Sequence, residues 1–258
     1  MQLQDLLFSQ GFGTRRVCAG LVQQGLVKIS PSDGAGGLVR CTDSTQQIEP
    51  EEGWRFQVQG ADWEYHQRAY VMLHKPAGTE CSQKPSTYPS VYSLLPPPLR
   101  QRPVKSAVQG VQAVGRLDQD TTGLLLLSDD GQFIHRMGSP KRHVPKVYQI
   151  TAKHEVTEAQ VQQLLAGVVL DDDPKPVRAA ACEVVGSHGL HLTLTEGKYH
   201  QVKRMLAAVG NRVEALHRSR IGTLELDIAL LAPGKWRWLS AEDLQKLQPL
   251  SAPAVQSA

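Results

Sequence analysis

A run of four leucines, Leu124–Leu127, directly follows a charged segment and constrains the fold more than any other feature of this chain. The surrounding stretch, GRLDQDTTGLLLLSDDG, closes the run with a Ser-Asp-Asp-Gly turn, which predicts a buried strand. Just upstream, Arg116, Asp118 and Asp120 place charge at the entrance of that strand. Ionised carboxylates beside a core are costly unless they are paired. The segment therefore predicts either a charge-paired site or a turn capped by aspartates.

From about residue 67 to residue 240 the pattern mixes strands and helices without the alternating rhythm of a parallel sheet. AYVMLHK and VYQITA read as strands, and AACEVVGSHGLHLTLTEG reads as a hairpin. TEAQVQQLLAGV and YHQVKRMLAAVGN have helical apolar spacing. The six prolines between residues 85 and 103 predict an irregular excursion without helix or inner strand. We expect an α+β fold with a mixed, largely antiparallel sheet flanked by helices.

Residues 1–60 predict a small module of two helices and a few strands. Leu3, Leu6 and Leu7 have helical spacing, and Thr14 is the expected N-cap of a second helix with Val17 and Leu21 on one face and Gly25 as its stop. A polar linker is expected at 61–68, a larger catalytic domain at 69–245 and a flexible tail at 246–258.

Composition is typical of a globular protein, with 41% hydrophobic and 21% charged residues and a formal net charge of +3. The four cysteines lie far apart without a C-x-x-C pair, which argues against a zinc site and favours a reducing compartment. The sequence has no signal-peptide pattern and no apolar run near the roughly 20 residues of a membrane span. We expect a cytoplasmic protein without a membrane partner and without a bound metal.

The mild net charge conceals two basic runs. Residues 135–146 hold four lysines and arginines and no acid, and residues 198–220 hold six against the single Glu214. Such segregation is typical of a polyanion site, because each phosphate contact releases counterions. One run alone is more often a solvated face. Two runs that flank an acidic cluster favour RNA or another polyanion.

The motifs GRLDQDTTGLLLLSDDG, KVYQI and EGKYHQVKRM, in this order, resemble those of the RsuA-type ribosomal RNA pseudouridine synthases. LHKPAG is similar to the lysine-proline turn of that family, and LLFSQGFGTRRVCAGLVQQGLVKI is similar to an S4-type RNA-binding module. The resemblance implies an isomerase that converts a uridine in ribosomal RNA to pseudouridine. It implies Asp118 as the catalytic carboxylate, Tyr148 as the active-site tyrosine and Lys203 as the cation beside Asp118.

The resemblance also implies that Arg116 enters the RNA helix as the target base leaves. The Lys203/Arg204 doublet leaves open which cation pairs with Asp118. The remaining polar and basic residues of these segments are the expected RNA contacts: Arg15, Arg16, Lys141, Arg142, Lys146, Lys198, His200, Gln201 and Arg204. The structural alternative is that these are ordinary surface or turn residues.

The chemistry is redox-neutral, so no cofactor is expected. Whether Asp118 adds to the base or takes a sugar proton stays open at this point. The run YHQVKRMLAAVGNRVEALHRSRIG is most similar to the small-subunit enzyme, which implies uridine 516 of 16S RNA as the target, within a partly assembled small subunit. The alternatives are a uridine of 23S RNA, a glycosidase that uses Asp118 and Asp120, and a non-catalytic ribosome-associated RNA-binding protein. We expect a monomer.

Overall fold

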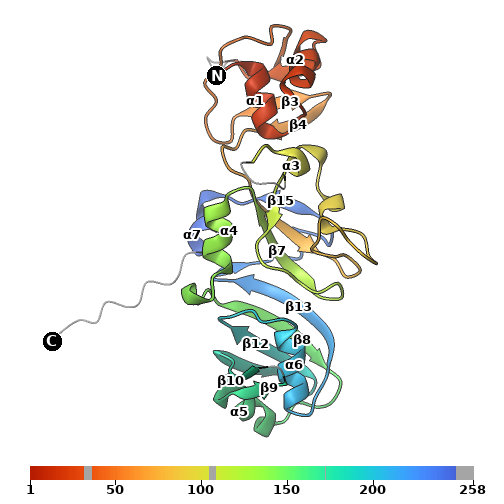
Figure 1. Cartoon of the computed structure of the whole chain (residues 1–258), viewed down its shortest axis with the longest axis vertical. Coiled ribbons are helices and arrows are strands. Elements are labelled where there is room, and N and C mark those ends of the chain that lie inside the picture. The colour runs from red at the N-terminus through yellow and green to blue at the C-terminus, as the bar shows by residue number, and fades with distance from the viewer. Residues whose placement is uncertain (32–36, 105–108, 172, 248–258) are drawn as a thin grey trace, which may run out of the picture. The chain divides into compact units, whose positions relative to one another are not determined.

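The computed structural model describes residues 1–31, 37–104, 109–171 and 173–247 (Figure 1). The chain forms two compact units. The first unit holds Met1–Tyr70 together with Leu95–Gln112 and Leu127–Gly131. The second holds Val71–Leu94, Ala113–Leu126 and the chain from Gln132 onward.

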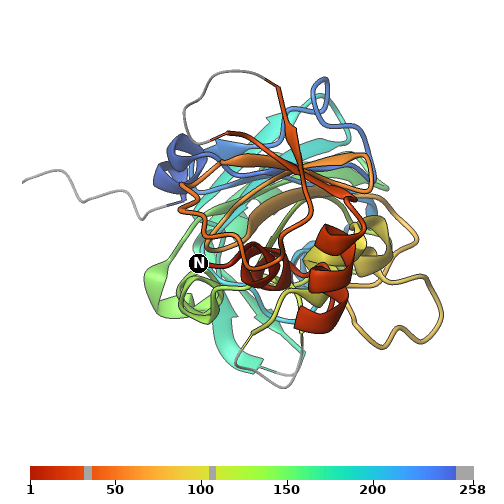
Figure 2. The same ribbon diagram turned by 90° about the horizontal axis from the view of Figure 1, so that it is seen from above.

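The first unit begins with two helices that lie side by side (Figure 2). Helix α1 (Leu3–Gln10) ends at Gly11, whose φ of 89° is left-handed, and helix α2 (Arg15–Gln23) starts at Thr14, whose side chain accepts a hydrogen bond from the Val17 backbone. These ends agree with the prediction. Val17 is 51% exposed, Leu21 is partly buried, and the buried face of α2 consists of Cys18 and Val22.

A four-stranded sheet completes the core of this unit. Its strands have the order β2-β1-β3-β4, and the expected linker is in part a strand, because β4 pairs with β3. Leu3, Leu6, Leu7 and Phe56 are fully buried in the resulting hydrophobic cluster. The bounds are β1 Val27–Ile29, β2 Val39–Cys41, β3 Arg55–Val58 and β4 Ala61–Glu64.

The proline-rich segment also differs from the prediction. It contains a 3-10 turn, η1 (Val91–Leu94), and a short helix, α3 (Pro97–Gln101). A proline is tolerated in the first turn of a helix, where its missing N–H would have no partner. Three consecutive prolines, Pro96–Pro98, therefore start a helix here instead of preventing one.

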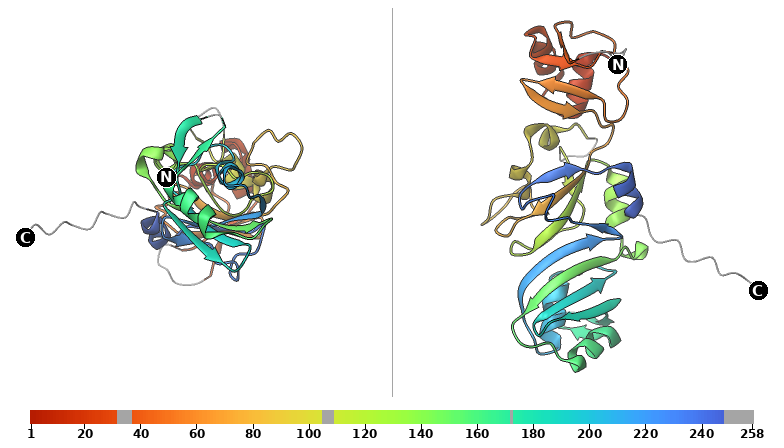
Figure 3. Two further views of the ribbon diagram at one scale, coloured as in Figure 1. Left: turned by 90° about the horizontal axis from the view of Figure 1, so that it is seen from below. Right: turned by 180° about the vertical axis from the view of Figure 1, so that it is seen from behind.

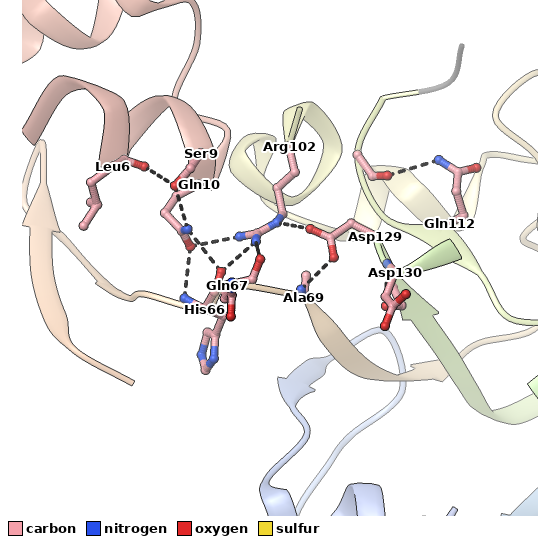
Figure 4. A network of polar contacts seen from close by, with 12 residues as sticks. Leu6, Ser9, Gln10, His66, Gln67, Ala69, Arg102, Gln112, Asp129 and Asp130 are labelled. Atoms are coloured by element: carbon pink, nitrogen blue, oxygen red, sulfur yellow. Dashed lines mark hydrogen bonds and ion pairs between the residues drawn. The ribbon is translucent and has the colours of Figure 1, made fainter. Parts of the chain in front are cut away.

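A buried ion pair lies within the first unit (Figure 4). Arg102 and Asp129 are almost fully buried, and Arg102 Nε donates to Asp129 Oδ2 at 2.6 Å. The remaining guanidinium donors reach Gln10 Oε1 at 2.9 Å and the carbonyl of His66 at 2.7 Å. Asp129 also accepts from the Ala69 backbone at 2.9 Å. This network joins helix α1, the strand connection and the turn after the leucine run.

The second unit is built on a nine-stranded mixed sheet with the order β11-β12-β8-β13-β7-β5-β15, where β14 pairs with β13 and β6 with β7. Most of its pairs are antiparallel, but β13 and β7 are parallel. The α+β prediction with a mixed, largely antiparallel sheet is confirmed. The strands are β5 Tyr70–Lys75, β6 Gln112–Ala113, β7 Thr122–Ser128, β8 Lys146–Ala152, β11 Ala181–Val185, β12 Gly189–Leu194, β13 Val213–Ile221, β14 Leu224–Glu225 and β15 Trp236–Trp238.

Helices and a small two-stranded sheet surround this sheet, and its long strand β13 is strongly curved (Figures 1 and 3). Helix α6 packs against β9, and helix α5 packs against β11. The remaining elements are α4 Gly131–Gly138, η2 Pro140–Arg142, α5 Glu158–Ala166, β9 Val168–Leu170, β10 Asp173–Val177, α6 Gln201–Ala208 and α7 Ala241–Lys246.

The leucine run forms the centre of β7, and all four side chains are fully buried, as predicted. Gly123 at the start of the strand has a φ of 111°, and a Cβ there would lie 2.3 Å from the backbone oxygen of Arg218. Only glycine allows β7 and β13 to approach this closely. The close approach brings the charged segment before β7 next to β13.

Candidate active site

The segment that precedes β7 is a loop held by a buried lysine. Lys75, at the end of β5, is fully buried, and its ammonium donates to the carbonyls of Pro76, Gln119 and Thr121 at 3.0, 3.3 and 2.8 Å. Burial lowers the pKa of Lys75. Gln119 lies between Asp118 and Asp120, and Thr121 follows Asp120, so Lys75 fixes the backbone from which both carboxylates project.

Helix α6 places a cation against these two carboxylates. Lys203 Nζ lies 3.2 Å from Asp118 Oδ2 and 2.6 Å from Asp120 Oδ1. His200 Nε2 lies 3.3 Å from Asp118 Oδ1. Arg204, the alternative partner of Asp118, instead donates to the carbonyl of Tyr199 at 3.2 Å. The geometry therefore pairs Asp118 with Lys203 and leaves Arg204 with another contact.

Charges in this cluster shift the pKa values of Asp120 and Lys203. Burial raises the pKa of Asp120. The hydrogen bond from Lys203 and the charge of Lys203 lower it by more, so the net pKa lies below its ordinary value. Burial lowers the pKa of Lys203, and its hydrogen bonds to Asp120 and Asp118 more than compensate, so the net pKa is raised. An opposite charge within about 4–6 Å favours the charged form of both partners. The lysine thus stays protonated at neutral pH.

Asp118 and Lys203 line a cavity of about 160 Å³ in the second unit. One water occupies roughly 30 Å³ of liquid, so the cavity has room for a small flat ring. Tyr148 on β8 lines it too and is 8% exposed, with its Cα registered opposite Leu192 and Arg218 on the neighbouring strands. The sequence-predicted residues that line this cavity are Arg116, Asp118, Lys146, Tyr148, Lys198, His200, Gln201 and Lys203.

The turn before α6 has an unusual backbone. His200 is its N-cap and has a left-handed φ of 48°, which is uncommon outside glycine. The His200 ring stacks on the exposed ring of Tyr199 at a centroid distance of 3.8 Å. Gln201 is buried, donating to Glu196 at 2.9 Å and accepting from the Lys198 backbone at 2.7 Å. Gln201 therefore shapes this turn in addition to lining the cavity.

Other predicted RNA contacts lie outside the cavity lining. Lys141 and Arg142 are exposed in η2. In the first unit, Arg15 pairs with Asp5 at 2.9 Å and covers the ring of Phe8, whereas Arg16 is exposed on the first turn of α2. Lys198 is paired as well, with Asp173 at 2.5 Å.

Two buried polar residues of the lining, Arg218 and Thr121, were not singled out as site candidates from the sequence. Arg218 on β13 is 2% exposed and Thr121 is 1% exposed, and both line the cavity. Arg218 Nη2 and Thr121 Oγ1 have no hydrogen-bond partner among the residues that the structure describes. The only sequence signal for Arg218 is its place in the second basic run. The family resemblance implies no role for Asp120, yet its carboxylate shares Lys203 with Asp118.

Within the described ranges, no group of three or more His, Cys, Asp or Glu residues is arranged to hold a metal ion. None of the helices in the same ranges has the length and hydropathy that a membrane span requires.

Comparison with known proteins places this site in a family. The model of the RNA pseudouridylate synthase family matches residues 69–208, which is more than half of the chain. The ribosomal small subunit pseudouridine synthase A of Haemophilus influenzae is 37% identical over 94% of this chain and 98% of its own length. The Escherichia coli protein of the same name is 43% identical over 69% of this chain and 74% of its own.

A solved structure agrees with these relatives. The crystal structure of a pseudouridylate synthase covers 96% of this chain and 99% of its own, with 34% identity and a TM-score of 0.63. The matched range includes Asp118, Tyr148 and Lys203, whose side chains line one cavity. The chain therefore belongs to the RNA pseudouridine synthases, the family that its sequence motifs predicted.

Proposed function

We propose that this enzyme converts one uridine of ribosomal RNA to pseudouridine at the cavity that Asp118, Tyr148 and Lys203 line. The observation that carries this proposal is the ion pair between Asp118 and Lys203 inside a cavity large enough for one base. Full-length similarity to small-subunit enzymes supports the choice of RNA.

Each side chain has a role that its position suits. A uridine in a helix must be flipped out of the stack before its ring is accessible. Arg116 is exposed on the loop beside the cavity, where its planar guanidinium can occupy the place that the base vacates. Tyr148 offers a flat face to the flipped ring. Lys203 forms an ion pair with the Asp118 carboxylate at 3.2 Å and holds it at the cavity wall.

The target that we propose is uridine 516 of 16S RNA in a partly assembled small subunit, and the enzyme acts as a monomer in the cytoplasm. Similarity to enzymes named for the small subunit supports this RNA over 23S RNA. We also propose that the N-terminal helices and four-stranded sheet act as an S4-like RNA-binding module. The exposed Arg16 at the start of α2 supports that role.

The test compares the wild-type chain with Asp118→Asn on 16S RNA from cells that lack this gene. We expect pseudouridine at one position with the wild type and none with Asp118→Asn, because the carboxylate acts in the transition state. RNA affinity should stay within a few-fold, since the substitution preserves the shape of the side chain.

Two controls accompany this comparison. Asp5→Asn removes a carboxylate of the first unit that pairs with Arg15, and it should leave turnover unchanged. A product in 23S RNA alone would contradict the proposed target, and near-wild-type turnover by Asp118→Asn would contradict the proposed catalytic carboxylate.

A further inference from the structure

The cavity contains more positive charge than its carboxylates neutralise. Lys203 pairs with Asp118 and Asp120. Of the four other cations that line the same cavity, Lys198 pairs with Asp173 and Arg116 is exposed on its loop; the remaining two are Arg218 and Lys146. Across the described part of the chain, neither has a carboxylate within the 4.0 Å of an ion pair.

The Arg218 guanidinium is fixed by one hydrogen bond, and one of its other nitrogen donors has no partner among the described residues. Its Nε donates to the carbonyl of Leu124 at 2.9 Å, which fixes the guanidinium against β7. Its Nη2 is buried without a hydrogen-bond partner. A buried charged donor that lacks a partner is costly, so such groups indicate a ligand or a catalytic role.

Lys146, at the start of β8, is the second uncompensated cation. Within the described residues its Nζ donates to one group, the carbonyl of Val144, at 3.1 Å. Burial, with a further contribution from the positive charge of Arg218, lowers the pKa of Lys146 to about 8. The two side chains thus repel each other in the absence of an anion, and negative charge placed between them would remove the repulsion.

The depth of Arg218 decides which part of the substrate it meets. At 2% exposure, its guanidinium is accessible only to the group that enters the cavity farthest. A phosphodiester continues into the rest of the RNA and stays near the surface, whereas the flipped base is the free end of its nucleotide. We propose that Arg218, assisted by Lys146, donates to a carbonyl oxygen of the flipped uracil and stabilises the negative charge that this ring acquires during isomerisation.

Both routes open to Asp118 place that charge on the ring. In elimination, Asp118 takes the proton from the C2′ carbon, a C1′–C2′ double bond forms, and the electron pair of the C1′–N1 bond leaves with uracil as an anion. In the addition route, Asp118 bonds to C6, the C5–C6 π electrons form a C4–C5 double bond, and the C4–O4 π electrons move to O4 as an enolate. Fixed donors aimed at developing charge accelerate such steps without reorganisation.

This inference rests on the proposed function, and its test is single-turnover kinetics of the full chain on reconstituted 16S particles. Arg218→Met should lower the rate of the chemical step by about 100- to 1,000-fold, as expected for loss of one such donor. Affinity for the particles should change little. Arg220→Met, on the same strand but half exposed and paired with Glu225, is the matched control and should keep the wild-type rate.

A second readout separates catalysis from a structural role. In particles made with 5-fluorouridine, the fluorine withdraws electrons and stabilises the ring anion, so loss of the starting nucleoside should depend less on Arg218. We expect the ratio of wild-type to Arg218→Met rates to be at least ten times smaller with 5-fluorouridine, whereas a misfolded site would slow both substrates equally.

Arg218→Lys and Lys146→Met carry the same comparison if Arg218→Met fails to fold. The role of Arg218 would be overturned if the ratio of wild-type to Arg218→Met rates were the same with uridine and 5-fluorouridine. It would also be overturned if Arg218→Met kept the wild-type rate. In either case the proposed function would stand, provided that the wild type forms pseudouridine. A wild-type chain that forms no pseudouridine would instead overturn the proposed function.

Discussion

At the scale of single residues, the site is organised by how its charges are paired. Asp118 and Asp120 share Lys203, and His200 makes a second contact to Asp118. Buried charges are tolerated when they are paired and hydrogen-bonded. Arg218 and Lys146 depart from this rule in a cavity that belongs to the catalytic unit, and such departures mark functional sites.

The pKa of Lys146 gives a prediction about pH. Burial and the nearby Arg218 lower this pKa to about 8, so the positive charge is present below pH 8 and is lost as the pH rises through that value. If the charge assists catalysis, kcat/KM should fall above about pH 8, because kcat/KM reports the free enzyme. A pH profile of kcat/KM measures this directly.

Lys146→Arg is the control for that profile. Arginine remains protonated throughout the range, so the falling limb should move to higher pH. A falling limb near pH 8 that is the same in Lys146→Arg would show that another group titrates there.

At the scale of elements, interactions remote in sequence hold the active loop and the first unit in place. Lys75 at the end of β5 fixes the carbonyls around Asp118, and the close contact at Gly123 joins β7 to β13. In the first unit, Arg102 and Asp129 connect helix α1 to the turn after the leucine run (Figure 4).

The Arg102–Asp129 pair predicts a large loss of stability on substitution. Asp129→Asn leaves the guanidinium buried without its counterion, so we expect the free energy of unfolding to fall by about 3–5 kcal/mol. Urea denaturation of the full chain measures the change. Asp5→Asn breaks the exposed pair with Arg15 and should cost less than about 1 kcal/mol. Similar losses in the two variants would show that burial of Arg102 is unimportant.

At the scale of the whole molecule, both units carry basic residues that are expected to contact RNA. Arg16 in the first unit is exposed, whereas its neighbour Arg15 is paired with Asp5. An unpaired exposed arginine is the better phosphate ligand, because no internal ion pair must be broken.

We therefore predict that Arg16→Ala weakens RNA binding and reduces the slope of log K against log salt by about 1, while turnover of bound RNA is unchanged. Binding titrations between about 50 and 200 mM salt measure this slope. Arg15→Ala should change the slope less. An unchanged slope in Arg16→Ala would argue against RNA contact by the first unit.

Local patterns in the sequence were sufficient for several features. The four leucines predicted a buried strand, Thr14 predicted a helix start, and the basic runs with the GRLD, KVY and HQVKR motifs predicted the family and an RNA substrate. These features depend on neighbouring residues or on the order of motifs, and both can be read from the sequence alone. The error in the proline-rich segment also has a local cause: Pro97 occupies the first turn of a helix, where proline is tolerated.

Only the tertiary structure decided how the charges are paired. Lys203 and Arg204 are adjacent in the sequence, and the orientation of α6 against the Asp118 loop determines that Lys203 reaches the carboxylate. Arg218 reads as one more cation of a basic run until the parallel pairing of β13 with β7 buries it in the cavity. Charge pairing and burial depend on distances between residues about 100 positions apart, and no local pattern encodes those distances.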